Sequence, residues 1–188
     1  MRKGRYVETM DEIKERDSKG CRIILFDTDK DMIKAWRKEF KDVENVQILK
    51  CSFKKIKSEY MVVPGNSCGV IYSELDLAVR AYYGIEMIDR IQYKIATWHH
   101  GKLAIGDSVV TAVEDGTDKP CLVYAPIISS PNNAPDAIDI FYAFYNILDK
   151  FKKDDIACCG FWIKTSRFSK EVCAKMMRKA YDEIYGEE

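Results

Sequence analysis

The chain has 188 residues, of which 30 are basic and 30 acidic, so its formal net charge is zero, and 47% of its residues are hydrophobic. This length suits one domain, and the composition excludes a disordered chain. A net charge of zero gives no overall attraction to nucleic acid or to an anionic membrane, so we expect neither as a partner. The polar N-terminus and the absence of a long apolar run predict a cytoplasmic protein.

The cysteines and histidines do not suggest a metal site. There are 7 cysteines, an odd number, and no Cys-x-x-Cys pair. Most of them lie in or beside apolar runs, so we interpret them as reduced core thiols. The only histidines, His99 and His100, are adjacent, and their diverging side chains suit a metal poorly. The sequence implies no metal or redox cofactor.

Strands and helices alternate along the predicted domain. Residues 1–20 are mostly polar, with apolar residues three or four apart, and we interpret them as an N-terminal extension with one short helix before a domain over 21–188. Apolar runs bounded by turn residues predict strands over 21–26, 46–51, 60–63, 108–113, 121–128 and 156–161. Helical spacing predicts helices after residue 29, over 73–82, around 88–95, over 135–152 and over 169–185. This alternation predicts a largely parallel sheet covered by helices on both faces.

Three local signals mark turns in this pattern. Ser73 and Asp76 are three residues apart and predict a capping box at the start of a helix. Gly84 predicts a left-handed stop at the end of that helix. Pro64, followed by glycine and Asn66, predicts a sharp break after the strand over 60–63.

Two loops that follow predicted strands are the main candidates for a binding site. Ligands of open α/β sheets bind beyond the carboxyl ends of the strands. The first loop reads Pro64-Gly-Asn-Ser-Cys-Gly69 and the second reads Gly160-Phe-Trp-Ile-Lys-Thr165. Small residues before a helix allow backbone N–H groups to converge on a phosphate, and lysine or threonine side chains can donate to it as well.

These two loops, each followed by a helix, resemble the pattern of the macro domain family, which binds ADP-ribose and its derivatives. The first match runs from a strand through the turn with Asn66 and a glycine-containing loop to an alanine-containing helix that ends in Gly84. The resemblance covers roughly residues 21–185 in the family's order. It implies a three-layer α/β/α fold with a mixed sheet, in a subgroup with an added N-terminal strand and helix.

The resemblance also implies a set of site residues. Asn66 would orient the ribose, although an asparagine at such a turn can also be a plain turn residue. Glu74 and Asp76 are two residues apart, and independently of the resemblance either could act as a general base, bind ribose hydroxyls or simply favour the helix N-terminus. The expected ligand contacts are Ser52, Pro64, Gly65, Ser67, Cys68, Gly69, Ser73, Ala125, Pro126, Gly160, Phe161, Trp162, Lys164 and Thr165.

The chain departs from the family pattern at three places. Ser52 stands where macro domains commonly have an aspartate that binds the adenine amino group, and Ser73-Glu74 replaces a glycine pair. Phe161 and Trp162 would obstruct a phosphate cradle or convert it into a stacking wall. Two functions therefore stay open. One is binding of ADP-ribose or a related nucleotide, with or without hydrolysis of an ADP-ribosyl or terminal phosphate bond, and the other is an inactive macro-fold module that binds or sequesters a protein partner.

Overall fold

The structure is a computed structural model, and it describes residues 22–113 and 117–186. The helix predicted within residues 1–20 lies outside this part of the chain. The strands are β1 (Ile23–Asp27), β2 (Val46–Lys50), β3 (Tyr60–Asn66), β4 (Val109–Thr111), β5 (Cys121–Ile128) and β6 (Ile156–Cys159). The helices are α1 (Lys30–Glu39), α2 (Glu74–Tyr83), α3 (Ile85–Trp98), α4 (Ala137–Lys150) and α5 (Lys170–Tyr185), with a short 3-10 helix, η1 (Phe53–Lys55).

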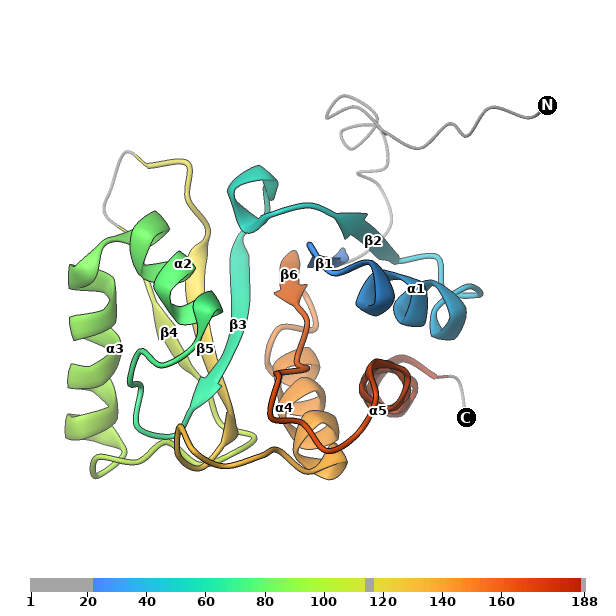
Figure 1. The fold of residues 1–188 in the computed structure, drawn as a ribbon. Helices are drawn as coiled ribbons and strands as arrows, with labels where there is room; N and C mark the ends of the chain where they lie inside the picture. Colours follow the sequence, from blue (N-terminus) through green and yellow to red (C-terminus); the bar gives the residue numbers. More distant parts are fainter. Residues whose placement is uncertain (1–21, 114–116, 187–188) are drawn as a thin grey trace.

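The described strands form one mixed sheet in the order β2-β1-β6-β3-β5-β4 (Figure 1). β2, β1, β6, β3 and β5 are mutually parallel, and β4 runs antiparallel to β5 at one edge. The carboxyl ends of all five parallel strands therefore meet at the same edge of the sheet. No helix in the described ranges is long and apolar enough to cross a membrane.

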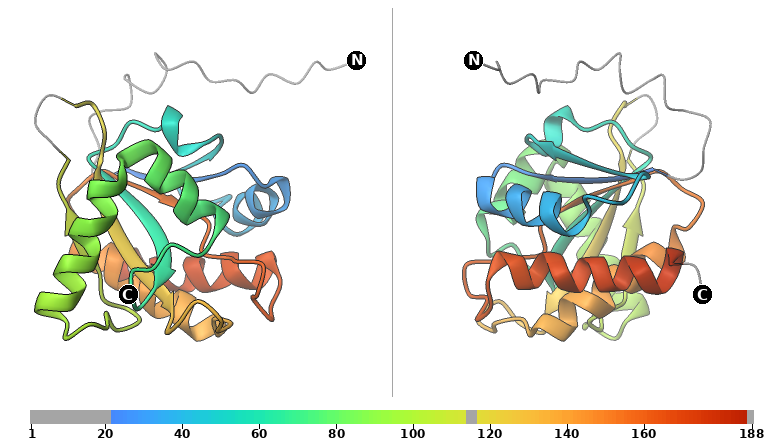
Figure 2. Two further views of the ribbon diagram at one scale, coloured as in Figure 1. Left: turned by 60° about the vertical axis from the view of Figure 1, so that its left-hand side comes forward. Right: turned by 90° about the vertical axis from the view of Figure 1, so that its right-hand side faces the viewer.

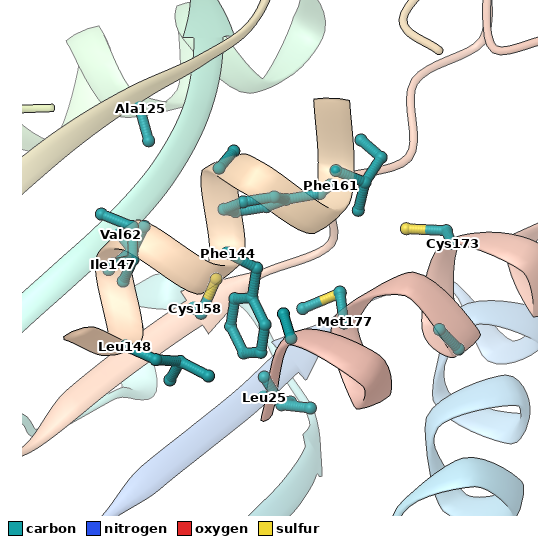
Figure 3. Close-up of a cluster of buried hydrophobic side chains, with 14 of the residues drawn as sticks. Leu25, Val62, Ala125, Phe144, Ile147, Leu148, Cys158, Phe161, Cys173 and Met177 are labelled. Atoms are coloured by element: carbon teal, nitrogen blue, oxygen red, sulfur yellow. The ribbon is translucent and has the colours of Figure 1, made fainter. Parts of the chain in front are cut away.

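Helices cover both faces of the sheet, which confirms the predicted three layers (Figure 2). Successive residues of a strand point to opposite faces. Ile23 and Leu25 of β1 pack in a core cluster with α1, α4 and α5, whereas Ile24 and Phe26 pack in a second cluster with α2 and α3. Figure 3 shows the first cluster, where the rings of Phe144 and Phe161 meet edge to face at 6.0 Å.

The third strand does not break where the sequence predicts. β3 continues through Pro64 to Asn66, with a register shift against β5 between Gly65 and Asn66. The N–H of Tyr60 donates to a carbonyl on the β6 side of the strand, and the two-residue period directs the nitrogen of Pro64 to that same side. β6 pairs with β3 only as far as Val62, so the sheet loses no hydrogen bond at the proline.

The signals around the helix over 73–82 are confirmed. Ser73 and Asp76 form a capping box at the start of α2, and Gly84 follows the helix with a φ of 96°. Two strands are shorter than predicted, since β4 covers Val109–Thr111 and β6 ends at Cys159. Gly160 and Phe161 therefore belong to the connection between β6 and α5.

Candidate functional site

A cleft of about 700 Å³ lies along the edge where the parallel strands end. It is lined by residues at or just after the ends of β2, β1, β6, β3 and β5, by the start of α2, and by the connection from β6 to α5. Neighbouring strands lie about 4.8 Å apart, so the cleft extends over about 19 Å of the sheet edge. Its position is the usual one for ligand sites in open α/β sheets.

The floor of the cleft depends on Gly65 and on Tyr124 beneath it. A Cβ atom at position 65 would lie 2.1 Å from the Tyr124 hydroxyl, so only glycine fits over this ring. That hydroxyl accepts a hydrogen bond from the N–H of Asn66 at 2.8 Å and donates to the Asn66 carbonyl at 3.0 Å. Burial raises the pKa of Tyr124, so the hydroxyl keeps the proton that it donates. Tyr124 was not among the predicted site residues, although the alternation along β5 directs it toward the second core cluster.

Asn66 lines the cleft, but its side chain is used to shape the first loop. The residue is 2% exposed, and its amide N–H donates to the Val70 carbonyl at 2.8 Å. Its Oδ1 accepts hydrogen bonds from the N–H groups of Cys68 and Val70, both at 3.2 Å. Asn66 thus closes a compact turn over residues 66–70.

Asp76 is likewise bound by its own chain. Its Oδ2 accepts hydrogen bonds from the N–H groups of Tyr72 and Ser73, at 3.1 and 2.8 Å, and from the Ser73 hydroxyl at 2.8 Å. The Ser73 hydroxyl in turn accepts from the N–H of Asp76 at 3.1 Å. These bonds fix the start of α2 at the rim of the cleft.

An ion pair joins two connections across the mouth of the cleft. Lys164, from the connection between β6 and α5, lies 2.8 Å from a carboxylate oxygen of Glu74 at the start of α2. The side chains are 81% and 86% exposed. The hydrogen bond from Lys164 holds the pKa of Glu74 below its ordinary range.

The predicted contact residues separate into two groups. Those that line the cleft, together with the candidate catalytic residues, are Ser52, Pro64, Gly65, Asn66, Ser73, Glu74, Asp76, Gly160, Trp162, Lys164 and Thr165. The others lie elsewhere: Ser67 is buried against β5, Cys68 is exposed, Gly69 packs on α3, Ala125 and Pro126 are buried in β5, and Phe161 is fully buried in the first core cluster.

The second loop begins with a glycine, followed by one aromatic residue that packs in the core and one that lines the cleft. A Cβ atom at Gly160 would lie 2.4 Å from Oδ2 of Asp27, so any side chain at this position would displace the Asp27 carboxylate. Phe161 packs inward among α4 and α5 (Figure 3). Trp162 is half-buried beside the cleft, and its indole N–H donates to the Phe168 carbonyl at 2.8 Å.

The end of β1, the loop after it and the start of α5 supply charged residues that were not among the predicted site residues. Asp29 caps α1 with Oδ1, and its Oδ2 lies 2.6 Å from the ammonium of Lys170, which also lies 4.7 Å from the centre of the Trp162 ring. Asp27 lines the cleft next to them, and burial raises the pKa of its carboxyl. The available signal was the position of Asp27 at the carboxyl end of a predicted strand. In the described ranges, no three His, Cys, Asp or Glu side chains gather to hold a metal ion.

Comparison with known proteins relates this architecture to solved structures. The chain matches no model of a known protein family and no curated protein sequence. The macrodomain of Mycobacterium tuberculosis DarG superposes with a TM-score of 0.59 and 13% identity, over 71% of this chain and 87% of that one. The Oceanobacillus iheyensis macrodomain with MES bound gives 0.60 and 14%, over 73% and 75%. Thermosipho africanus DarTG in complex with ADP-ribose gives 0.58 and 10%, over 85% of this chain and 50% of that one.

Proposed function

The chain has the fold of a macrodomain, and we propose that its cleft binds ADP-ribose or a related nucleotide metabolite. The observation that carries this proposal is an elongated cleft across the carboxyl ends of five parallel strands. A solved structure of the same fold, that of Thermosipho africanus DarTG, is a complex with ADP-ribose. We therefore propose the same ligand for this cleft.

The chemistry of the cleft suits a ligand with an apolar ring at one end and phosphates further along. Phe26 and Phe53 give the end at β1 and β2 an apolar lining. Gly65 and Gly160 lie nearer the centre and present no side chain, so a ligand can approach the backbone closely. Lys164 lies at the mouth, where its ammonium can exchange the Glu74 carboxylate for a phosphate.

The three candidate catalytic residues favour binding over hydrolysis. The amide of Asn66 and one carboxylate oxygen of Asp76 are held by hydrogen bonds within their own loops. Glu74 is exposed and paired with Lys164, and the lowered pKa that results from this hydrogen bond makes it a weaker base. We therefore propose that ligand binding, without rapid turnover, is the principal activity of this site.

The alternative function is a module that presents Phe161 and Trp162 to a protein partner. Such a module needs both aromatic rings on the surface. Phe161 is fully buried, and Trp162 is half-buried with its indole N–H bonded to the backbone. Neither ring is presented as an exposed aromatic patch. The cleft itself is therefore the better candidate for the functional surface.

Isothermal titration with ADP-ribose tests the proposed function. We expect micromolar binding by the wild-type chain and a loss of about threefold to tenfold for Lys164→Ala, which removes one charged hydrogen-bond donor. Lys153→Ala is the matched control, because Lys153 is exposed in the turn before β6, at the opposite edge of the sheet, and should leave affinity unchanged. No heat at millimolar ADP-ribose would reject the proposal, and product formation on prolonged incubation would reject the preference for binding over hydrolysis.

A further inference from the structure

We propose that Asp27, rather than residue 52, is the carboxylate that recognises the base of the ligand, by accepting a hydrogen bond from an exocyclic amino group. In the same pocket the Ser52 hydroxyl donates to the ring nitrogen beside that group. This inference rests on the proposed function, because it assigns the base of the nucleotide to the end of the cleft at β1 and β2.

This end of the cleft has the composition of a pocket for a flat ring. Phe26, Met32 and Phe53 line it, and they are 2%, 1% and 8% exposed, so their positions are fixed by the core. A heteroaromatic ring gains most of its binding energy from such apolar contacts, whereas a few polar groups set its orientation. Asp27 and Ser52 are polar residues that line the cleft with these three, as are Thr28 and Asp29.

Asp27 is a partly buried carboxylate without an ion-pair partner in the described part of the chain. Its Oδ1 accepts a hydrogen bond from the N–H of Asp29 at 2.9 Å, and the N–H of Gly160 also donates to its carboxylate. The charge of Asp27 contributes to the raised pKa of Lys170, so the two groups are near each other, but the Lys170 ammonium is bonded to Asp29. Burial raises the pKa of Asp27, and an unpaired, desolvated carboxylate in a cleft is a typical feature of a functional site.

The carboxylate of Asp27 has acceptor capacity left for a ligand. Two carboxylate oxygens together accept about four hydrogen bonds. The N–H groups of Thr28, Asp29 and Gly160 are the donors that lower the pKa of Asp27 against the effect of burial. Four acceptor sites and three donors leave room for one further donor, and Asp27 lines the cleft in which a ligand would supply it.

Ser52 follows β2, the neighbour of β1 in the sheet, and both Ser52 and Asp27 line the cleft. The N–H of Cys51 donates to the Asp27 carbonyl at 3.1 Å, which places the two strand ends together. Ser52 is the N-cap of η1, but its side chain makes no capping hydrogen bond, so the hydroxyl is available to a ligand. This end of the cleft therefore offers a pair of groups, a carboxylate that only accepts and a hydroxyl that can donate.

This pair matches one hydrogen-bonding pattern of nucleobases. Adenine presents an amino donor next to a ring nitrogen that accepts, whereas hypoxanthine presents a carbonyl acceptor next to a ring N–H. A carboxylate favours the first pattern and repels the second, because it would face an oxygen with no proton between them. The loss of one charged hydrogen bond in a buried site corresponds to a change in affinity of about tenfold to a hundredfold.

The test is to titrate ADP-ribose and its hypoxanthine analogue, inosine diphosphate ribose, against wild-type protein and the Asp27→Asn variant. We expect the wild-type chain to bind ADP-ribose at least about tenfold more tightly than the analogue. In Asp27→Asn this ratio should fall to about one, because a carboxamide can also donate to the hypoxanthine carbonyl. The ratio of two affinities within one protein cancels any general damage to the cleft.

Asp31→Asn is the matched control for charge. Asp31 is an exposed carboxylate in the first turn of α1 and does not line the cleft, so its removal should leave the ratio unchanged. Equal binding of the two ligands by the wild-type chain would overturn the inference even if Asp27→Asn failed to fold. An unchanged ratio in a folded Asp27→Asn variant would overturn it as well, and in both cases binding of ADP-ribose would leave the proposed function standing. Absence of ADP-ribose binding by the wild-type chain would overturn both.

Discussion

Asp27 and Asp29 lie two residues apart, yet their surroundings move their pKa values in opposite directions. Burial raises the pKa of Asp27, whereas the hydrogen bond from Lys170 lowers the pKa of Asp29. Because the pKa of Asp27 is raised, ionising its carboxyl lowers the folding stability as the pH rises from the ordinary pKa through the raised one. A lowered pKa means that the charged form stabilises the fold above the ordinary pKa and loses this effect as the pH falls. Asp29 therefore contributes stability that Asp27 does not, and its N–H also fixes the Asp27 carboxylate through a hydrogen bond of 2.9 Å.

We expect the variant Asp29→Asn to isolate the ion pair between Asp29 and Lys170. Asparagine caps a helix about as well as aspartate, so α1 keeps its N-cap. The Asp29 side chain is 41% exposed, so solvent screening limits the expected loss of stability at about pH 7 to about 1 kcal/mol. Because the pKa of Asp29 is lowered, the difference from wild type should shrink below about pH 3.9. Urea unfolding across this range measures it, and a difference that does not vary with pH would contradict an ionic origin.

At the scale of elements, the start of α2 combines helix capping with the shape of the cleft rim. The Ser73 hydroxyl and the Asp76 carboxylate satisfy N–H groups of the first turn. Both residues line the cleft, as does Glu74 between them. The local sequence that begins the helix thus also sets the position of the residue that pairs with Lys164 across the mouth.

Ser73→Ala should reduce the free energy of unfolding by about 1 kcal/mol, because the N–H of Asp76 and the Asp76 carboxylate each lose a partner. Ser73→Thr keeps the hydroxyl and is the matched variant, with an expected loss of a few tenths of a kcal/mol. Denaturant unfolding of both variants makes the comparison. Equal losses for alanine and threonine would show that the hydroxyl does not provide the cap.

Elements whose limits are marked by nearby residues in the sequence were predictable, whereas elements whose limits depend on neighbouring strands were not. The capping box of α2 depends on residues three apart, so the sequence alone indicates it. The continuation of β3 through Pro64 depends on where β6 ends, which no local pattern reveals. The site shows the same division: the two loops were predicted, whereas the inward position of Phe161 is decided by its packing against Phe144.

To predict that Asp27 and Lys170 belong to the site, one must know the order of the strands in the sheet. Asp27 ends the first strand in the sequence, and Lys170 begins the last helix. The sequence does not say that β1 lies directly beside β6, which brings Asp27 against Gly160. Once that pairing is known, the approach of these segments explains why a glycine stands at position 160.

At the scale of the whole molecule, the connection between β6 and α5, together with the first residue of α5, is attached to both walls of the cleft. Lys164 pairs with Glu74 of α2, which belongs to the layer on one face of the sheet. Lys170 pairs with Asp29 at the start of α1, in the layer on the other face (Figure 1). The two pairs differ in exposure, since the Lys170 side chain is 19% exposed and that of Lys164 is 81% exposed. The pair at the mouth is therefore the one that a ligand can open.

Glu74→Gln should increase the affinity for ADP-ribose about twofold to fivefold at low salt, because Lys164 is released to a ligand phosphate and a carboxylate that repels that phosphate is removed. Exposed charges are strongly screened, so the gain should decline between about 50 and 300 mM salt. Titration calorimetry at the two salt concentrations measures this, with Glu171→Gln as a control at an exposed acidic residue in the first turn of α5. Weaker binding by Glu74→Gln at both concentrations would instead mean that Glu74 contacts the ligand directly, and the ion pair would then organise the bound state rather than compete with it.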